Sequence, residues 1–365
     1  MDKRIYQIAL SLLNGLGPTT AKRLVAAVGS LEGVFIEKES NFRHFHDLRI
    51  DFSKGLEREK CIERAQQELA YIEEQNIQLY YYQDPNYPTN LKQCVDAPIV
   101  LFTLGKVYFN QKNISIVGTR KCTDYGKKMT GRLVEELSPY KVQIISGLAH
   151  GIDKLAHETA LQNGLSTLGV LGHGLDTMYP AAHRGLAKTM LENGGLVTEF
   201  ISGTVGIPTN FPKRNRIIAG LSEATVVIES SETGGSMITA NLANDYNREV
   251  FAFPGYADKE FSSGCNNLIK RSKAHLLSET SDLTTILGWE NQDIEIDHVI
   301  NEDLLKDLND IESQFVTLFM ERGDIDFDSL AQATNLDSSN VSVHLFNLEM
   351  KGVIKTLPGK RYSLV

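Results

Sequence analysis

Apolar and polar residues repeat along this chain with different periods, which divide it into three regions. In residues 1–70 the apolar side chains recur at helical spacing, a pattern typical of amphipathic helices. Within this region, residues 12–29 carry apolar residues on both sides of Gly15 and Gly17. The pattern predicts a helix-hairpin-helix whose backbone amides can hold a phosphate. The alternative is a plain helical turn with Pro18 at the start of the second helix.

In the middle of the chain, short continuous apolar runs alternate with helical patterns. Such runs predict a parallel sheet covered by helices on both faces. The predicted strands are 114–118, 143–147, 167–172, 195–200, 224–230 and 250–255. The predicted helices are 125–137, 152–162, 182–193, 213–220 and 236–248. Residues 76–91 and 99–105 are expected to lengthen the sheet as a lead-in.

The last region combines three helical stretches with two short β runs around Pro358 and Gly359, which is a winged-helix pattern. The sequence therefore predicts an α/β protein with a Rossmann-like extended parallel sheet, a small all-α N-terminal domain and a C-terminal winged helix. The expected boundaries are 1–72 for the helical domain, 73–288 for the core, 289–310 for an acidic linker and 311–365 for the winged helix.

The net charge of −9 at first argues against nucleic acid, but its distribution changes that interpretation. Residues 1–112 hold 14 basic and 14 acidic residues, residues 113–288 hold 17 of each, and residues 289–365 hold 6 basic and 15 acidic residues. The whole excess therefore lies in the C-terminal region. The remainder is neutral and can still focus positive potential in one groove.

Targeting and redox signals indicate a cytoplasmic protein. No signal peptide is expected from the first residues, and no run approaches the roughly 18 apolar residues of a membrane helix. The four cysteines lie far apart, which argues against a disulfide framework and a zinc site. His150 and His157 have no carboxylate or cysteine to complete a metal site, so no metal is expected.

Four glycine-rich loops follow predicted strands, at the edge where ligands bind in open α/β sheets. In the first loop Gly118 allows a close turn and Arg120 follows it. The planar fork of an arginine matches phosphate oxygens in a bidentate way. The alternative is an arginine that forms a salt bridge with a neighbouring helix.

In the second loop, Ser146 and Gly147 close a strand and Gly151 precedes a helix. Helix N-termini offer unpaired N–H groups and the positive end of a dipole, both suited to an anion. Asp153 favours the same helix start, so it can be a simple cap.

The third loop carries a basic cluster at the start of an apolar helix, formed by Lys213, Arg214, Asn215 and Arg216. Basic residues at a helix N-terminus oppose the usual dipole preference, and a bound phosphate backbone would explain them. Phe211 can stack on a base, or it can be a core residue. The alternative for the charges is a solvated turn.

In the fourth loop, Gly234 and Gly235 lead into a helix through Ser236. The backbone amides of such a loop can wrap a phosphate, with Ser236 and Thr239 as further donors. The alternative is a helix with Ser236 as its N-cap.

Several motifs of enzymes and cofactor proteins are absent from the sequence. It contains no G-x-x-x-x-G-K-[ST], no G-x-G-x-x-G after the first core strand, no G-x-S-x-G and no H-E-x-x-H. A P-loop ATPase and ordinary dinucleotide binding are therefore not expected. The sequence predicts no cofactor and no catalytic residue.

Taken in order and spacing, these segments resemble the Rossmann-like core of the DprA (Smf) family. The resemblance covers roughly residues 75–285. It rests on residues 115–120, 144–153, 171–180, 211–222 and 232–243, with a lead-in at 87–91 and 96–105. The helical N-terminus and the winged helix are similar to appendages that many members carry.

The resemblance implies a non-enzymatic protein that binds and protects single-stranded DNA, forms a homodimer through its core and loads the RecA recombinase during natural transformation. The DNA site that it implies consists of Arg120, Ser146, Gly147, Phe211, Lys213, Arg214, Asn215, Gly234, Gly235 and Ser236. The loop patterns add Gly151, Arg216 and Thr239 to that site.

Two other functions are weighed against this one. Rossmann-like enzymes that hydrolyse nucleoside monophosphates carry P-G-G-x-G-T-x-x-E, and the loop over 232–240 lacks its glutamate. A winged helix also suggests a transcription regulator. Its candidate recognition helix over 338–351 has one lysine and no arginine, so it would gain little from counterion release on a duplex. A protein contact or a packing role is expected for it instead.

Overall fold

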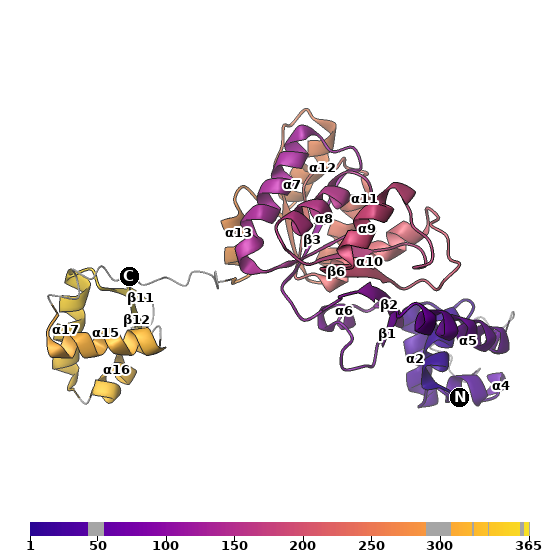
Figure 1. Ribbon diagram of the computed structural model, residues 1–365, viewed down its shortest axis with the longest axis horizontal. Helices are drawn as coiled ribbons and strands as arrows, with labels where there is room; N and C mark the ends of the chain where they lie inside the picture. Colours follow the sequence, from indigo (N-terminus) through magenta and orange to yellow (C-terminus); the bar gives the residue numbers. More distant parts are fainter. Residues whose placement is uncertain (43–54, 290–307, 323–324, 335, 358–360, 365) are drawn as a thin grey trace. The chain divides into compact units, whose positions relative to one another are not determined.

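The computed structural model describes residues 1–42, 55–289, 308–322, 325–334, 336–357 and 361–364. The chain divides into two compact units, Met1–Glu290 and Asn291–Val365 (Figure 1). Each unit has its own apolar core. Within the described part of the chain, no helix combines the length and the apolar character that crossing a membrane requires.

The first unit begins with helices, as the apolar spacing predicts. Gly15 adopts a φ of +73° between α1 and α2, a conformation that glycine tolerates. Pro18 is the first residue of α2, where its missing N–H needs no partner. Ile8 and Leu24 are fully buried in one cluster that also includes Val100 of the sheet, so the helices and the sheet share a core. The helices are α1 (Lys3–Leu12), α2 (Pro18–Val28), α3 (Gly33–Ile36), α4 (Glu39–Phe42) and α5 (Arg58–Glu74).

The described residues of this unit form a nine-stranded sheet with the order β1-β2-β6-β5-β4-β3-β7-β8-β9. Along the part of this order that runs from β6 through β5, β4, β3, β7 and β8 to β9, every pair of neighbouring strands is parallel. β2 runs antiparallel to both β6 and β1, so the lead-in does lengthen the sheet. The strands are β1 (Gln78–Tyr81), β2 (Val100–Gly105), β3 (Asn113–Val117), β4 (Gln143–Ser146), β5 (Thr167–Val170), β6 (Gly194–Thr198), β7 (Ala224–Val227), β8 (Glu249–Ala252) and β9 (His275–Leu276).

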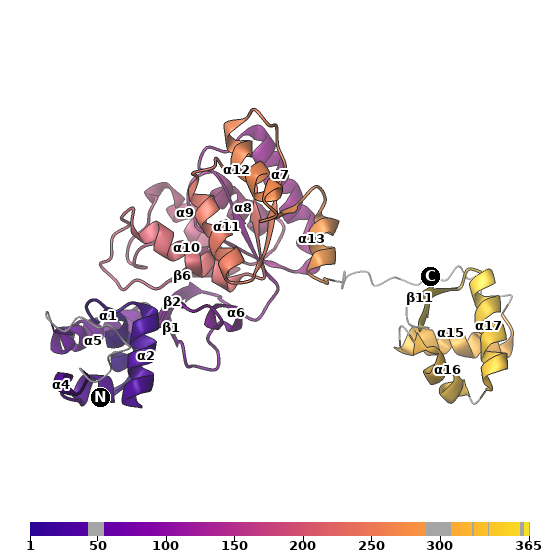
Figure 2. The same ribbon diagram turned by 180° about the vertical axis from the view of Figure 1, so that it is seen from behind.

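Helices cover both faces of this sheet (Figures 1 and 2). Successive strand residues point to opposite faces, so Ile116 and Val117 belong to different apolar clusters. The Ile116 cluster includes residues of α7 (Asp124–Glu136), α8 (Ile152–Gln162) and α13 (Thr280–Ile286). The Val117 cluster includes residues of α6 (Thr89–Lys92), α10 (Asn210–Leu221), α11 (Gly235–Asp245) and α12 (Glu260–Lys270). A smaller cluster holds α9 (Arg184–Met190) against β5 and β6. The predicted α/β fold class is confirmed.

Two differences from the predicted elements concern the candidate site. The helix expected over 213–220 begins at Asn210, because Pro212 is compatible with a first helical turn, where N–H groups have no helical partner. The basic cluster therefore begins at the fourth residue of the helix instead of at its start. The sequence pattern also predicts no element between residue 255 and the linker at 289, whereas α12, β9 and α13 lie there.

The second unit is the predicted winged helix. Its helices are α15 (Asp310–Arg322), α16 (Phe327–Thr334) and α17 (Ser338–Met350). A small sheet has the order β10-β12-β11, with β10 (Ile325–Asp326), β11 (Ile354–Leu357) and β12 (Arg361–Leu364). Phe315, Leu330 and Leu345 are buried in its core. Most of the linker expected over 289–310, and the turn at 358–360, lie outside the described residues.

The order of the strands creates a switch point beside β3. From β3 the chain adds β4, β5 and β6 on one side and then β7, β8 and β9 on the other. β3 and β7 are neighbours, and the loops that follow them lead toward opposite edges of the sheet. This arrangement opens a crevice at the carboxyl ends of the strands, where ligands bind in such sheets.

Candidate nucleic-acid interface

A cavity of about 670 Å³ opens at this crevice, between the loops after β3 and β7 and the first turns of α10 and α11. Many residues singled out from the sequence line it, although they come from distant segments. They are Arg120, Phe211, Arg214, Asn215, Gly234, Gly235, Ser236 and Thr239. Other predicted residues do not line this cavity, namely Ser146, Gly147, Gly151, Lys213 and Arg216.

Arg120 is exposed on a loop whose backbone is fixed. The N–H of Thr119 donates to the carbonyl oxygen of Glu229 at 2.8 Å. The carbonyl oxygen of Thr119 in turn accepts from the N–H of Ile152 at 3.2 Å. Within the part of the chain that the structure describes, the Arg120 side chain has no hydrogen bond and no ion pair. The alternative of a structural salt bridge therefore finds no partner there, and the guanidinium is free to meet a ligand.

Phe211 forms an aromatic platform next to this arginine. Its ring centroid lies 5.5 Å from that of Tyr179, and 5.9 Å from the guanidinium carbon of Arg120. A Cβ on Gly172 would lie 3.0 Å from Cδ1 of Phe211, so glycine lets the ring lie close to the backbone. An aromatic face flanked by cations is suited to stack a base beside its phosphate.

Arg214 lies in the same cavity wall but is buried, with 5% of its surface exposed. Its guanidinium donates to the carbonyl oxygens of Gly147 and Val170, and its Nε donates to Oδ1 of Asn215 at 3.2 Å. Burial lowers the pKa of Arg214 to about 10, and the nearby Asp153 opposes that shift. The side chain is therefore cationic at neutral pH and holds the loops after β4 and β5 against α10.

The glycines of the second loop make these contacts possible. A Cβ on Gly147 would lie 2.6 Å from both terminal nitrogens of Arg214. Gly151 has a φ of +79°, and its Cβ would lie 2.3 Å from the carbonyl oxygen of Thr119. The Ser146 hydroxyl is buried and donates to the carbonyl oxygen of Ile116 at 2.6 Å. These three residues shape the cavity from behind.

The glycine-rich turn after β7 forms the opposite wall. α11 begins at Gly235, so the N–H groups of Gly235 and Ser236 precede the regular hydrogen bonds of the helix. The Ser236 hydroxyl donates to Oγ of Ser230 at 2.8 Å. A Cβ on Gly234 would lie 2.4 Å from that same Oγ. The turn is thereby held with the dipole of α11 directed at the cavity, an arrangement that favours an anion.

The remaining residues of the basic cluster face different ways. Lys213 is exposed. Asn215 donates from Nδ2 to the carbonyl oxygen of Gly235 at 3.3 Å and so links the two walls. Arg216 forms an ion pair with Glu199 and donates to the carbonyl oxygen of Asp96. Arg216 therefore joins α10 to the end of β6 and to the lead-in.

The structure adds lining residues that the sequence pattern did not single out. Lys121 is exposed beside Arg120, and its place in the same loop was a usable signal. Tyr179 and Ile238 are 51% and 41% exposed at the cavity. Tyr179 lies in residues 171–180, which carry the family resemblance but contain none of the predicted site residues, and Ile238 looks like an ordinary core residue of a helix. Phe261 comes from α12, which was not predicted.

The histidines near the cavity have structural contacts. The rings of His150 and His183 lie 4.6 Å apart, and Nδ1 of His183 hydrogen-bonds with the carbonyl oxygen of Leu148. No group of three or more histidine, cysteine, aspartate or glutamate side chains suited to a metal ion occurs among the described residues.

Comparisons with known proteins agree with this fold. Residues 78–288 match the family described as DNA recombination-mediator protein A, and residues 309–360 match the DprA winged helix domain. Protein Smf of Synechocystis is 30% identical, in an alignment that covers 99% of each chain.

Two solved structures are also similar. That of DNA processing protein A from Streptococcus pneumoniae has a TM-score of 0.66 at 30% identity and covers 78% of this chain and 98% of its own. DNA processing protein A from Helicobacter pylori, whose structure is described as giving a single-stranded DNA binding mode, has a TM-score of 0.53 at 27% identity, covering 58% of this chain and 95% of its own. The chain therefore belongs to the DprA (Smf) family of DNA processing proteins.

Proposed function

We propose that this protein binds single-stranded DNA in the cavity at the switch point beside β3. The observation that carries the proposal is the guanidinium of Arg120, which has no hydrogen bond or ion pair to any described residue and lies next to the ring of Phe211. The cation is placed to contact a phosphate while the ring stacks on the attached base. The amides at the start of α11 would receive a second phosphate from the opposite wall.

The cavity chemistry favours a single strand over a duplex. Phe211 and Tyr179 offer ring faces to bases, and bases in a duplex are already stacked and paired. The other polar groups are backbone amides, hydroxyls and cations, which contact phosphates and carry little sequence preference. The Helicobacter pylori relative, which has a described single-stranded DNA binding mode, supports the same ligand class.

We further propose that the bound strand is protected and passed to the RecA recombinase during natural transformation. The matched family is described as a recombination mediator, and such a protein must deliver its strand to a recombinase. We expect a homodimer that forms through the Rossmann-like core, in the cytoplasm, without an enzymatic step. The expected role is therefore to hold DNA and not to cleave it.

Fluorescence anisotropy with the full chain tests the proposal. A labelled oligothymidylate and a hairpin duplex of equal charge are titrated between 50 and about 300 mM salt. We expect stronger binding of the single strand and a steep fall of its affinity with salt, because phosphate contacts release counterions. Equal affinity for the duplex, or an affinity that is independent of salt, would overturn the proposal.

A second assay separates binding from catalysis. Nucleoside monophosphates and the oligonucleotide are incubated with the protein, and free bases and shortened strands are measured by chromatography. We expect both substrates to remain intact. Base release that an Arg120→Ala substitution abolishes would instead indicate a nucleotide-hydrolysing enzyme.

A further inference from the structure

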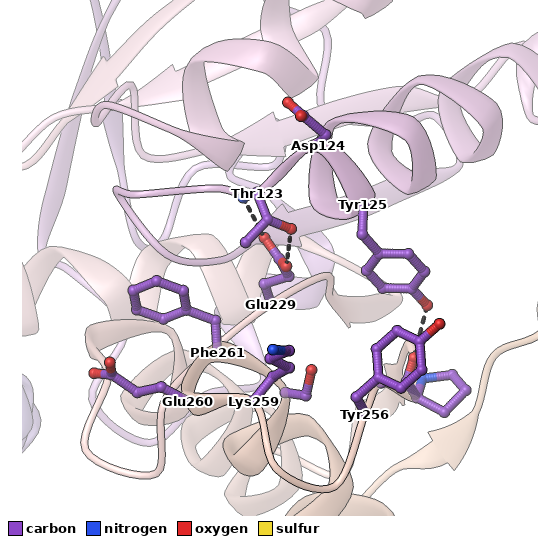
Figure 3. Close-up of a pocket in the computed structure, with 11 residues that line it drawn as sticks. Thr123, Asp124, Tyr125, Glu229, Tyr256, Lys259, Glu260 and Phe261 are labelled. Carbon is purple, nitrogen blue, oxygen red and sulfur yellow. Dashed lines mark hydrogen bonds between the residues drawn. The ribbon is translucent and has the colours of Figure 1, made fainter.

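A second cavity of about 830 Å³ lies at the same edge of the sheet, between the start of α7 and the loop that follows β8. Figure 3 shows Tyr125 and Tyr256 on one side of it and Phe261 with Glu260 on the other. Its volume falls in the range of roughly 300–1,000 Å³ that is common for small-ligand sites. None of the residues predicted from the sequence lines it.

The cavity offers two exposed tyrosine side chains. Tyr256 is 76% exposed, and Tyr125 is 38% exposed. The Tyr125 hydroxyl donates to the carbonyl oxygen of Pro254 at 2.6 Å, which fixes the orientation of its ring (Figure 3). A fixed ring beside an exposed one is suited to hold a planar apolar group.

The charges around the cavity select a base over a phosphate. Asp124, Glu229 and Glu260 all line it, against Lys259. Glu229 is buried in the wall of the cavity. Its carboxylate accepts hydrogen bonds from the N–H and the hydroxyl of Thr123 at 2.9 and 2.5 Å. Because the carboxylates outnumber the single lysine, a phosphate would be repelled. A neutral base that donates hydrogen bonds would be accepted.

The second cavity adjoins the first. Glu260 and Phe261 line both of them. A strand whose phosphates lie near Arg120 and the start of α11 can therefore pass over Phe261 without leaving the protein surface.

We propose that the second cavity is a nucleobase subsite, which receives a further base of the same DNA strand between Tyr125 and Tyr256. This inference rests on the proposed function, because the strand must first bind at Arg120. The base stacks on the tyrosines, while the sugar-phosphate backbone of the strand stays away from the carboxylates that line the cavity. Phe261 lies between this subsite and the first cavity. The subsite increases the affinity for strands that are long enough to reach it.

The test measures affinity against strand length for the wild-type protein and the Tyr256→Ala variant. Oligothymidylates of about 3 to 20 nucleotides are titrated by anisotropy. For the long strands we expect a loss of at least about fivefold, which matches the lower end of base–aromatic stacking. For the shortest strands that still bind we expect no change. The matched control is Tyr108→Ala, which removes a tyrosine that is 65% exposed and precedes β3, away from both cavities.

A cross-linking measurement locates the base directly. Oligothymidylates with one 5-iodouracil are irradiated with the wild-type protein, and cross-linked peptides are identified by mass spectrometry. We expect a cross-link in a peptide that contains Tyr125 or Tyr256, in addition to one at Phe211.

The outcomes separate the two proposals. If the wild-type protein binds no oligonucleotide, the proposed function fails. If it binds, but Tyr256→Ala behaves as Tyr108→Ala does for every length and no tyrosine of the subsite is cross-linked, only the nucleobase subsite is refuted. An equal loss for short and long strands also refutes it, because Tyr256 would then act on the first cavity.

Discussion

Nη1 of Arg214 lies 2.5 Å from the main-chain oxygen of Gly147 and donates a hydrogen bond to it. The same nitrogen donates to the carbonyl oxygen of Val170. One buried cation thus joins the ends of β4 and β5 to α10. The position of the loop after β4 therefore depends on this side chain.

Replacement of Arg214 by methionine is expected to lower the free energy of unfolding by about 3 kcal/mol, measured by urea denaturation. The substitution leaves two buried carbonyl oxygens without their donor and leaves Asp153 without its nearby cation. Burial already raises the pKa of Asp153, against the effect of Arg214. Loss of the arginine is therefore expected to raise this pKa further.

Lys213→Ala is the matched control for Arg214→Met. The two residues are adjacent, but Lys213 is exposed, so its loss should change the unfolding free energy by less than about 0.5 kcal/mol. Equal stabilities for the two variants would contradict the structural role of Arg214.

Arg120→Ala is expected to weaken binding of single-stranded DNA by about 1.5–3 kcal/mol, the usual range for a hydrogen bond to a charged group. The slope of log affinity against log salt should fall by about 0.7, the value per phosphate for a single strand. The melting temperature should change little, because the side chain has no hydrogen bond or ion pair within the described part of the chain.

Lys106→Ala removes the same charge from an exposed position after β2, at the amino end of β6. It should leave both affinity and salt slope close to those of the wild type. A salt slope that Arg120→Ala leaves unchanged would show that Arg120 contacts no phosphate.

Acid should destabilise the protein through His157. The hydroxyl of Thr167 donates to the carbonyl oxygen of Ile144, so it accepts from Nδ1 of His157 at 2.7 Å. Nε2 is then unprotonated, and it is buried without a partner among the described residues. Burial lowers the pKa of His157 from 6.5 to about 3, so a proton on this ring is strongly disfavoured in the folded state.

Between pH 6.5 and about 3 the unfolded chain binds a proton at this histidine that the folded protein does not. Stability is therefore lost as the pH falls through this window, by about 1 kcal/mol at pH 5.5. His157→Asn keeps a donor toward Thr167 and does not titrate. Its unfolding free energy, measured in urea from pH 7.5 to 5.5, should decrease less than that of the wild type. Parallel curves for the two proteins would contradict this prediction.

Removal of residues 291–365 is expected to leave the binding of single-stranded DNA within about tenfold of the full chain, or about 1.4 kcal/mol. The two units have separate cores, and the removed region carries the excess of acidic residues. α17 exposes Val343, Phe346 and Met350, which suits a protein contact better than a phosphate. Anisotropy on a truncation with native circular dichroism checks this, and a larger loss would assign DNA contacts to the winged helix.

The sequence by itself determined the sheet and the edge that carries the site. A strand that is covered on both faces is apolar at most positions, so runs such as residues 114–117, apolar except for Ser115, predict buried parallel strands without knowledge of their neighbours. Glycines that follow such strands mark the places where the backbone turns closely. Gly151 shows why, because any Cβ there would collide with the carbonyl oxygen of Thr119.

Only the tertiary structure decided the direction of each basic side chain. Lys213, Arg214 and Arg216 form one cluster in the sequence, but each residue of a helix is rotated by about 100° from the previous one. Lys213 is therefore exposed, Arg214 is buried under the cavity, and Arg216 pairs with Glu199 away from it. These directions depend on how the helix is placed in the fold. The sequence predicts a helix that starts at residue 213, whereas the helix begins at Asn210.

The second cavity likewise depends on contacts that no local pattern contains. Tyr125 lies in the first turn of α7, and Tyr256 lies in the loop after β8. Their side chains line one cavity because β3 and β8 both flank β7. Strand order is set by how the helices pack over the whole sheet. The pattern of apolar and polar residues within one strand carries no information about which strands lie beside it.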